Sequence, residues 1–80
     1  MSRPALLLLS RPGCHLCEEF REDLEQAFPR RFELCEACVD DRPEWREAWG
    51  RKIPVLLAED GTVLCETRFD PEVLQRRYPH

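Results

Sequence analysis

The sequence predicts an α/β domain with the element order β-α-β-α-β-β-α and a four-stranded mixed sheet that has helices on both faces. Three observations lead to this fold class. An aliphatic run precedes an amphipathic helix, a second strand follows that helix, and a hairpin signal precedes the last helix. Eighty residues suit one domain, which we take to span residues 1–80.

The first half of the chain predicts a strand, a helix and a second strand. Residues 5–9, ALLLL, form an aliphatic run that is typical of a strand buried on both faces. Over residues 16–28 apolar side chains recur at helical spacing, and Pro29 ends this helix. Residues 32–39 then have the mixed polarity of a further strand. Because a helix joins the two strands, we expect them to pair in parallel.

The second half predicts a short helix, a hairpin and a last helix. Pro43 suits the first position of the short helix. Residues 55–57 are another aliphatic strand, and Asp60-Gly61 is a strong signal for a two-residue hairpin turn into an antiparallel strand over residues 62–66. Asp70 is placed as the N-cap of the last helix.

Composition and charge exclude several classes of function. The formal net charge is −4, with acidic and basic residues interspersed. This argues against nucleic acid as the main partner, because phosphate binding needs a basic face. No stretch approaches the ~20 apolar residues of a membrane span, and the aliphatic run is shorter than a secretion signal. We therefore expect a cytoplasmic monomer whose partners are neither nucleic acids nor membranes.

Four of the five cysteines form two C-x-x-C pairs. Cys14 and Cys17 precede Cys35 and Cys38 at a spacing that is typical of a four-thiolate zinc site. An amphipathic helix should hold the two pairs apart, however. Residues three apart in a strand also point to opposite faces, so the second pair would not face one ion. We therefore expect no metal site, with a structural zinc protein as an alternative.

The first pair is better interpreted as a redox couple. Cys14 would lie at the helix start, where unpaired N–H groups and the helix dipole favour a thiolate. Such a position can lower the pKa of a cysteine from ~8.5 to about 3.5–7.5. Cys17, one turn on, would be near enough to attack a mixed disulfide formed on Cys14. His15, if protonated, would favour the thiolate further.

The other cysteines differ in their surroundings. Cys35 and Cys65 fall on predicted strands with apolar companions, so we expect both to be buried. Cys38 has polar neighbours, which indicates exposure and leaves an accessory thiol as an alternative. A binding module that keeps the fold without turnover is a further alternative for the whole chain.

Three features together resemble the glutaredoxin branch of the thioredoxin-fold superfamily. They are RPGCHLCEEF after an aliphatic strand, KIPVLL after the second helix, and the element order. The likeness covers nearly the whole chain and is strongest to short bacterial glutaredoxin-like proteins, in which a GCHLC start and an RFD opening of the last helix recur. It implies a thioredoxin-like fold of the glutaredoxin type.

The resemblance also implies roles for individual residues. Cys14 would be the nucleophile and Cys17 the resolving thiol. Pro54 would be the cis-proline of the family, with the backbone of Ile53 free to pair with substrate. Arg11 matches the basic residue that glutaredoxins place beside the glycine carboxylate of glutathione. The implied activity is thiol–disulfide exchange without a dissociable organic cofactor.

Two departures from the glutaredoxin pattern leave the substrate open. The motif here is Cys-His-Leu-Cys where glutaredoxins typically have Cys-Pro-Tyr-Cys. Residues 67–70, TRFD, replace the Gly-Gly turn that holds the γ-glutamyl end of glutathione. Protein disulfides and glutathione, the latter as a co-substrate, both remain candidate partners.

Overall fold

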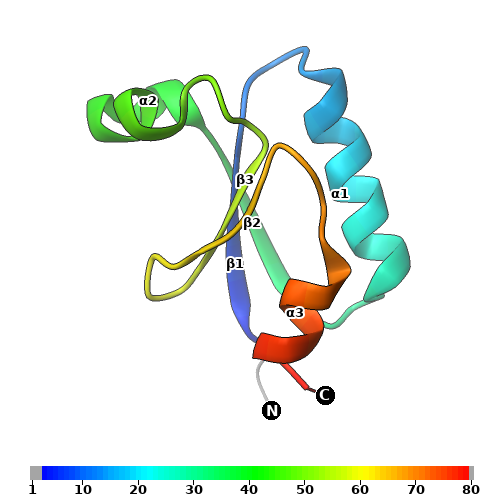
Figure 1. Ribbon diagram of the computed structural model, residues 1–80. Helices are drawn as coiled ribbons and strands as arrows, with labels where there is room; N and C mark the ends of the chain where they lie inside the picture. The colour runs from blue at the N-terminus through cyan, green and yellow to red at the C-terminus, as the bar shows by residue number, and fades with distance from the viewer. Residues whose placement is uncertain (1–2, 80) are drawn as a thin grey trace.

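The computed structural model describes residues 3–79, which form one four-stranded sheet and three α-helices (Figure 1). The strands are β1 (Ala5–Ser10), β2 (Glu33–Cys38), β3 (Val55–Ala58) and β4 (Val63–Glu66). The helices are α1 (His15–Ala27), α2 (Pro43–Trp49) and α3 (Pro71–Arg77), with a short 3-10 helix, η1 (Val39–Asp41), before α2. The predicted fold class and element order are confirmed.

The sheet is mixed, with the strand order β2-β1-β3-β4. Strand β1 pairs with β2 in parallel, as the intervening helix α1 requires, and with β3 in antiparallel orientation. Strand β4 returns antiparallel to β3. This order places the carboxyl ends of β1 and β2 and the start of β3 at the same end of the sheet.

Neighbouring residues of β1 pack into two separate cores. Leu8 packs with Phe20 of α1 and Leu74 of α3. Leu9, which points the other way, packs in a second cluster with Trp45 of α2. Helices α1 and α3 therefore cover one face of the sheet and α2 covers the other (Figure 1). No helix within the described residues is long and apolar enough to cross a lipid bilayer.

The start of α3 forms as the sequence predicts. Asp70 is the N-cap, and its Oδ1 accepts the N–H of Glu72 at 3.1 Å. Pro71 occupies the first helical position, where a missing N–H costs nothing. Phe69, before the cap, and Leu74, after it, pack in the same core, which fits a hydrophobic staple.

The β3–β4 hairpin corrects the predicted two-residue turn, because four residues, 59–62, connect the strands. Gly61 has a φ of +89°, a conformation that favours glycine. Oδ1 of Asp60 accepts the N–H of Thr62 at 3.0 Å. The N–H of Gly61 donates to the carbonyl of Ala58 at 3.0 Å and the N–H of Ala58 donates to the carbonyl of Thr62 at 2.9 Å. The strand pairing shifts register within β3.

Cys35 is exposed, so its predicted burial was wrong. Cys35 lies on β2, which is an edge strand of the sheet, and pairs with Leu7 of β1. Helix α2 has only seven residues and packs near Leu9 and Val39, at the other end of this face. Helix α2 therefore does not cover Cys35, although Cys35 has apolar neighbours in the sequence. Cys65 is buried, as predicted.

Candidate active site

Cys14 and Cys17 are joined by a disulfide at the start of α1, with their Cα atoms 5.3 Å apart. Cys14 is the N-cap of the helix and has an extended backbone. Its Sγ accepts the N–H of Cys17 at 3.2 Å. A first-turn N–H has no partner inside the helix, so the sulfur of Cys14 takes the place of the usual capping oxygen. The predicted position of this pair is confirmed.

A tight turn carries the chain from β1 into α1. The N–H of Cys14 donates to the carbonyl of Arg11 at 3.2 Å, and Gly13 has a φ of +77°. A Cβ at Gly13 would meet no atom within 4 Å, so the backbone conformation rather than space favours glycine there. The turn folds Cys14 back toward the end of β1.

The two sulfur-bearing residues differ in access to solvent. Cys14 is half-buried, whereas only 2% of Cys17 is exposed. An incoming molecule would therefore reach the first cysteine, with the second one behind it. This asymmetry suits a nucleophile and a resolving thiol.

A cavity of about 330 Å³ opens beside the disulfide, between the turn, the start of α1 and the end of β2. Cys14 and Cys17 line one side of it and Cys38 lines another. Arg21 and Glu36, two charged residues that line it, are paired with each other. Arg21 contacts Glu36 at 2.8 Å, and Glu36 also accepts the hydroxyl of Ser10 at 3.1 Å.

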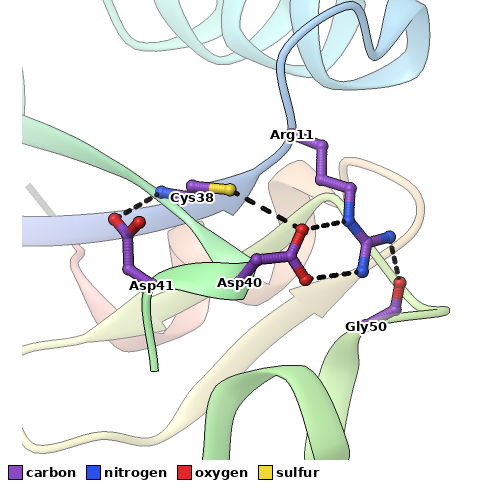
Figure 2. Close-up of polar contacts among 5 residues, drawn as sticks. All are labelled: Arg11, Cys38, Asp40, Asp41 and Gly50. Carbon is purple, nitrogen blue, oxygen red and sulfur yellow. Dashed lines mark hydrogen bonds and ion pairs between the residues drawn. The ribbon is translucent and has the colours of Figure 1, made fainter. Parts of the chain in front are cut away.

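Arg11 is bound to groups of its own chain at the edge of this cavity (Figure 2). Its Nε and Nη2 donate to the two carboxylate oxygens of Asp40 at 2.8 and 3.0 Å. Its Nη1 donates to the carbonyl of Gly50 at 2.6 Å. The hydrogen bonds between Arg11 and Asp40 lower the pKa of the Asp40 carboxyl and raise the pKa of the Arg11 guanidinium. The sequence reveals neither partner.

Gly50 permits this close approach. A Cβ at this position would clash with the carbonyl oxygen of Arg46 and lie 3.2 Å from Nη2 of Arg11. The guanidinium of Arg11 thus joins the active-site turn to η1 and to the end of α2. Arg11, which the resemblance places beside a substrate carboxylate, therefore also binds groups of its own chain.

The Ile53–Pro54 peptide bond is cis, as the resemblance implied. Pro54 is fully buried, and its carbonyl accepts the N–H of Thr67 at 2.7 Å. Because Val55 pairs with Leu9 of β1, Pro54 lies at the sheet edge from which the Cys14 turn leaves. Within residues 3–79, no hydrogen bond joins the backbone of Ile53 to another residue.

His15 lies on the exposed surface of α1. Its Nε2 is 3.0 Å from a carboxylate oxygen of Glu19, and its Nδ1 is 4.0 Å from Glu18. The ring contacts these two carboxylates of its own helix. Its influence on Cys14 stays a prediction.

The second C-x-x-C pair does not form a unit. Cys38 lines the cavity beside Cys14, whereas Cys35 lies on the other side of β2 and outside the cavity. Sequence reasoning gave Cys38 little weight, although the register that pairs it with Ser10 is the feature that brings it to the site. Among the described residues, no three His, Cys, Asp or Glu side chains are placed to hold a metal ion.

Comparisons with known proteins agree with this geometry. The family described as Glutaredoxin-like domain (DUF836) matches residues 5–77. The chain is similar to the solution structure of protein Ne2328 from Nitrosomonas europaea, with 26% identity, a TM-score of 0.85 and coverage of 96% of this chain and 93% of that one. It is also similar to the X-ray structure of protein XcR50 from X. campestris, with 31% identity, a TM-score of 0.70 and coverage of 92% and 95%.

A search of the curated proteins finds no match. The family match covers all four strands and all three α-helices, including the cysteine pair at the start of α1. The chain therefore belongs to the glutaredoxin-like domain family (DUF836) and has a thioredoxin-like fold.

Proposed function

We propose that this protein is a thiol–disulfide oxidoreductase in which Cys14 is the nucleophile and Cys17 the resolving thiol. The observation that carries the proposal is the capping bond from the N–H of Cys17 to the half-buried sulfur of Cys14. A charged acceptor makes a stronger hydrogen bond than a neutral one, and a helix N-terminus favours negative charge. In the reduced protein this bond favours the thiolate, which is the attacking species.

The reaction needs no group beyond the two thiols. The Cys14 thiolate attacks one sulfur of a substrate disulfide, and the other substrate sulfur leaves as a thiolate that takes a proton from water. Cys17 then loses its proton and attacks Sγ of Cys14, which releases the second substrate thiol. Two electrons pass from the protein to the substrate. The product is the Cys14–Cys17 disulfide that the structure contains.

The surroundings of the pair suit an extended substrate. The unpaired backbone of Ile53 lies at the sheet edge beside the active-site turn and can pair with a peptide in a β-like manner. Pro54, the next residue, is fully buried. We propose protein disulfides as substrates, or glutathione as a co-substrate, in the cytoplasm, with Arg11 and His15 at the edges of the binding surface and no organic cofactor.

The pH dependence of alkylation tests the activated thiol. Iodoacetamide is added to the reduced Cys17→Ser, Cys35→Ser, Cys38→Ser variant, and modification of Cys14 is followed by mass spectrometry. We expect the reaction midpoint within about 3.5–7.5, below the ~8.5 of a free cysteine. N-acetylcysteine is the control. A midpoint equal to that of the control would leave a binding module as the better account.

Trapping identifies the substrate class. With Cys17→Ser and Cys38→Ser together, Cys14 has no other thiol on its cavity to resolve the mixed disulfide, which should therefore persist. Its mass after isolation from cells distinguishes glutathione from a protein. Metal analysis of the reduced wild-type protein accompanies this experiment, since one bound zinc per chain would favour the structural alternative.

A further inference from the structure

Cys38 is a third cysteine on the cavity that Cys14 and Cys17 line. We propose that Cys38 is a second resolving thiol, which attacks a mixed disulfide on Cys14 and releases the reduced substrate as a Cys14–Cys38 disulfide forms. The inference rests on the proposed function of Cys14. It assigns a role to the half of the second C-x-x-C pair that faces the site.

The sheet directs Cys38 toward α1. Leu34 packs against the core on the α1 face, and alternate residues of a strand share a face. Glu36 and Cys38 therefore share that face, and Glu36 indeed contacts Arg21 of α1. Cys38 is half-buried, so its thiol is accessible from the cavity.

Strand register brings Cys38 near the active-site turn. Cys38 pairs directly with Ser10 of β1, and neighbouring strands lie about 4.7–4.9 Å apart. The turn that begins at Arg11 closes with a 3.2 Å bond from the N–H of Cys14. Cys38, at the end of β2, and Cys14, at the end of the turn that follows β1, therefore lie on two sides of one cavity.

Asp40 gives the Cys38 thiol an acceptor. The S–H of Cys38 donates to Oδ2 of Asp40 at 3.9 Å, and its N–H donates to Asp41 at 3.3 Å (Figure 2). The hydrogen bond from Arg11 lowers the pKa of the Asp40 carboxyl. Asp40 therefore contacts both the Cys38 thiol at the cavity wall and Arg11 in the turn before α1.

The proposed step conserves atoms and electrons. Cys38 releases its proton to water, and its thiolate attacks Sγ of Cys14 in the mixed disulfide. The bond from Cys14 to the substrate sulfur breaks, the bond between Cys14 and Cys38 forms, and the substrate leaves as a thiolate that takes a proton from water. The two cysteines together lose the two electrons that the substrate gains.

Ellman's reagent tests the step in a Cys17→Ser, Cys35→Ser variant, which keeps Cys14 and Cys38. Loading with one equivalent at about pH 5, where only a thiol of lowered pKa is a thiolate, puts the thionitrobenzoate adduct on Cys14. The sample is then brought to about pH 8, nearer the pKa of an ordinary thiol. We expect release of a second coloured equivalent, at a rate independent of protein concentration, and a Cys14–Cys38 disulfide in unreduced peptide maps.

Two matched variants decide what causes the release. Cys17→Ser, Cys38→Ser keeps the exposed Cys35 on the same strand and should hold its adduct; release from it would show that exposure alone suffices and would overturn the proposal. The triple variant that also carries Cys35→Ser should hold its adduct too. Circular dichroism checks the fold, and Cys38→Ala repeats the result with a smaller, apolar replacement.

A parallel sample separates this inference from the proposed function. Cys35→Ser, Cys38→Ser keeps Cys14 and Cys17 and should release the second equivalent rapidly. If it does so while the Cys17→Ser, Cys35→Ser adduct stays intact, Cys38 is not a resolving thiol and the proposed function stands. If neither sample releases it, the proposed function has failed together with the inference.

Discussion

The spacing C-x-x-C occurs twice in this chain, and the two copies have different structural consequences. On α1 the sulfurs of Cys14 and Cys17 meet, and a disulfide joins them. On β2 the same spacing sends Cys35 to the surface on one face and Cys38 into the active-site cavity on the other. A helix brings residues three apart together and a strand separates them. The spacing therefore has a chemical meaning only together with the secondary structure that carries it.

The largest expected effect separates the two pairs by activity. Cys14→Ser should reduce the rate of disulfide reduction to the uncatalysed level, because no other group supplies the attacking thiolate. Cys35→Ser should leave the rate unchanged, since Cys35 lies outside the cavity. Reduction of a small aromatic disulfide, followed by absorbance, measures both. Equal loss of activity in the two variants would break the contrast between the pairs.

The next effect concerns the helix that brings the first pair together. Phe20, one turn beyond the disulfide, is 2% exposed and packs against Phe69. Phe20→Ala should lower the free energy of unfolding by about 3–5 kcal/mol, which is a large part of the ~4–12 kcal/mol typical of a chain this long. Urea unfolding followed by circular dichroism measures the loss.

Leu16 provides the matched control on the same helix. Its side chain is 54% exposed, so Leu16→Ala should change the free energy of unfolding by no more than about 0.5 kcal/mol. Comparable losses at the two positions would mean that α1 is not held to the sheet by the face that contains Phe20.

The elements that the sequence predicts well are those with local causes. The aliphatic run of β1 buries both of its faces, and the cap at Asp70 fixes the start of α3 within a few residues. The start of α1 is equally local, because Cys14 caps a helix whose N–H groups need acceptors in any context. Sequence reasoning could therefore place Cys14 and Cys17 at the start of α1 before any tertiary contact was known.

The features that the sequence predicts poorly depend on distant partners. Asp40 lies far along the chain from Arg11, and no pattern in the sequence predicts their ion pair. The exposure of Cys35 follows from the shortness of α2 and from the edge position of β2. The place of Cys38 follows from its register with Ser10. Each of these facts requires the assembled sheet.

A smaller effect tests the tie between the active-site turn and the second pair. Asp40→Asn removes the charge that Arg11 contacts, and it should lower Tm by a few degrees, about the effect of one surface ion pair in a small domain. The difference from wild type should shrink in high salt, which screens exposed charges. Glu44→Gln is the control, because its contact with Arg42 is 4.0 Å long and exposed. Equal shifts in both variants would remove the special role of the Asp40 contact.

The smallest effect involves Cys65, which belongs to neither pair. Burial raises the pKa of its thiol, so the folded state retains this proton more strongly than the unfolded chain does. The resulting stability is present below the ordinary thiol pKa of ~8.5 and is lost as the pH rises through the higher folded value. The urea midpoint of wild type should therefore fall more steeply above about pH 9 than that of Cys65→Ala.

Iodoacetamide at about pH 8 should modify the exposed Cys35 while native Cys65 stays unmodified. Equal labelling of Cys35 and Cys65 would mean that β4 opens to solvent. Iodoacetamide labelling would then no longer distinguish exposed cysteines from buried ones.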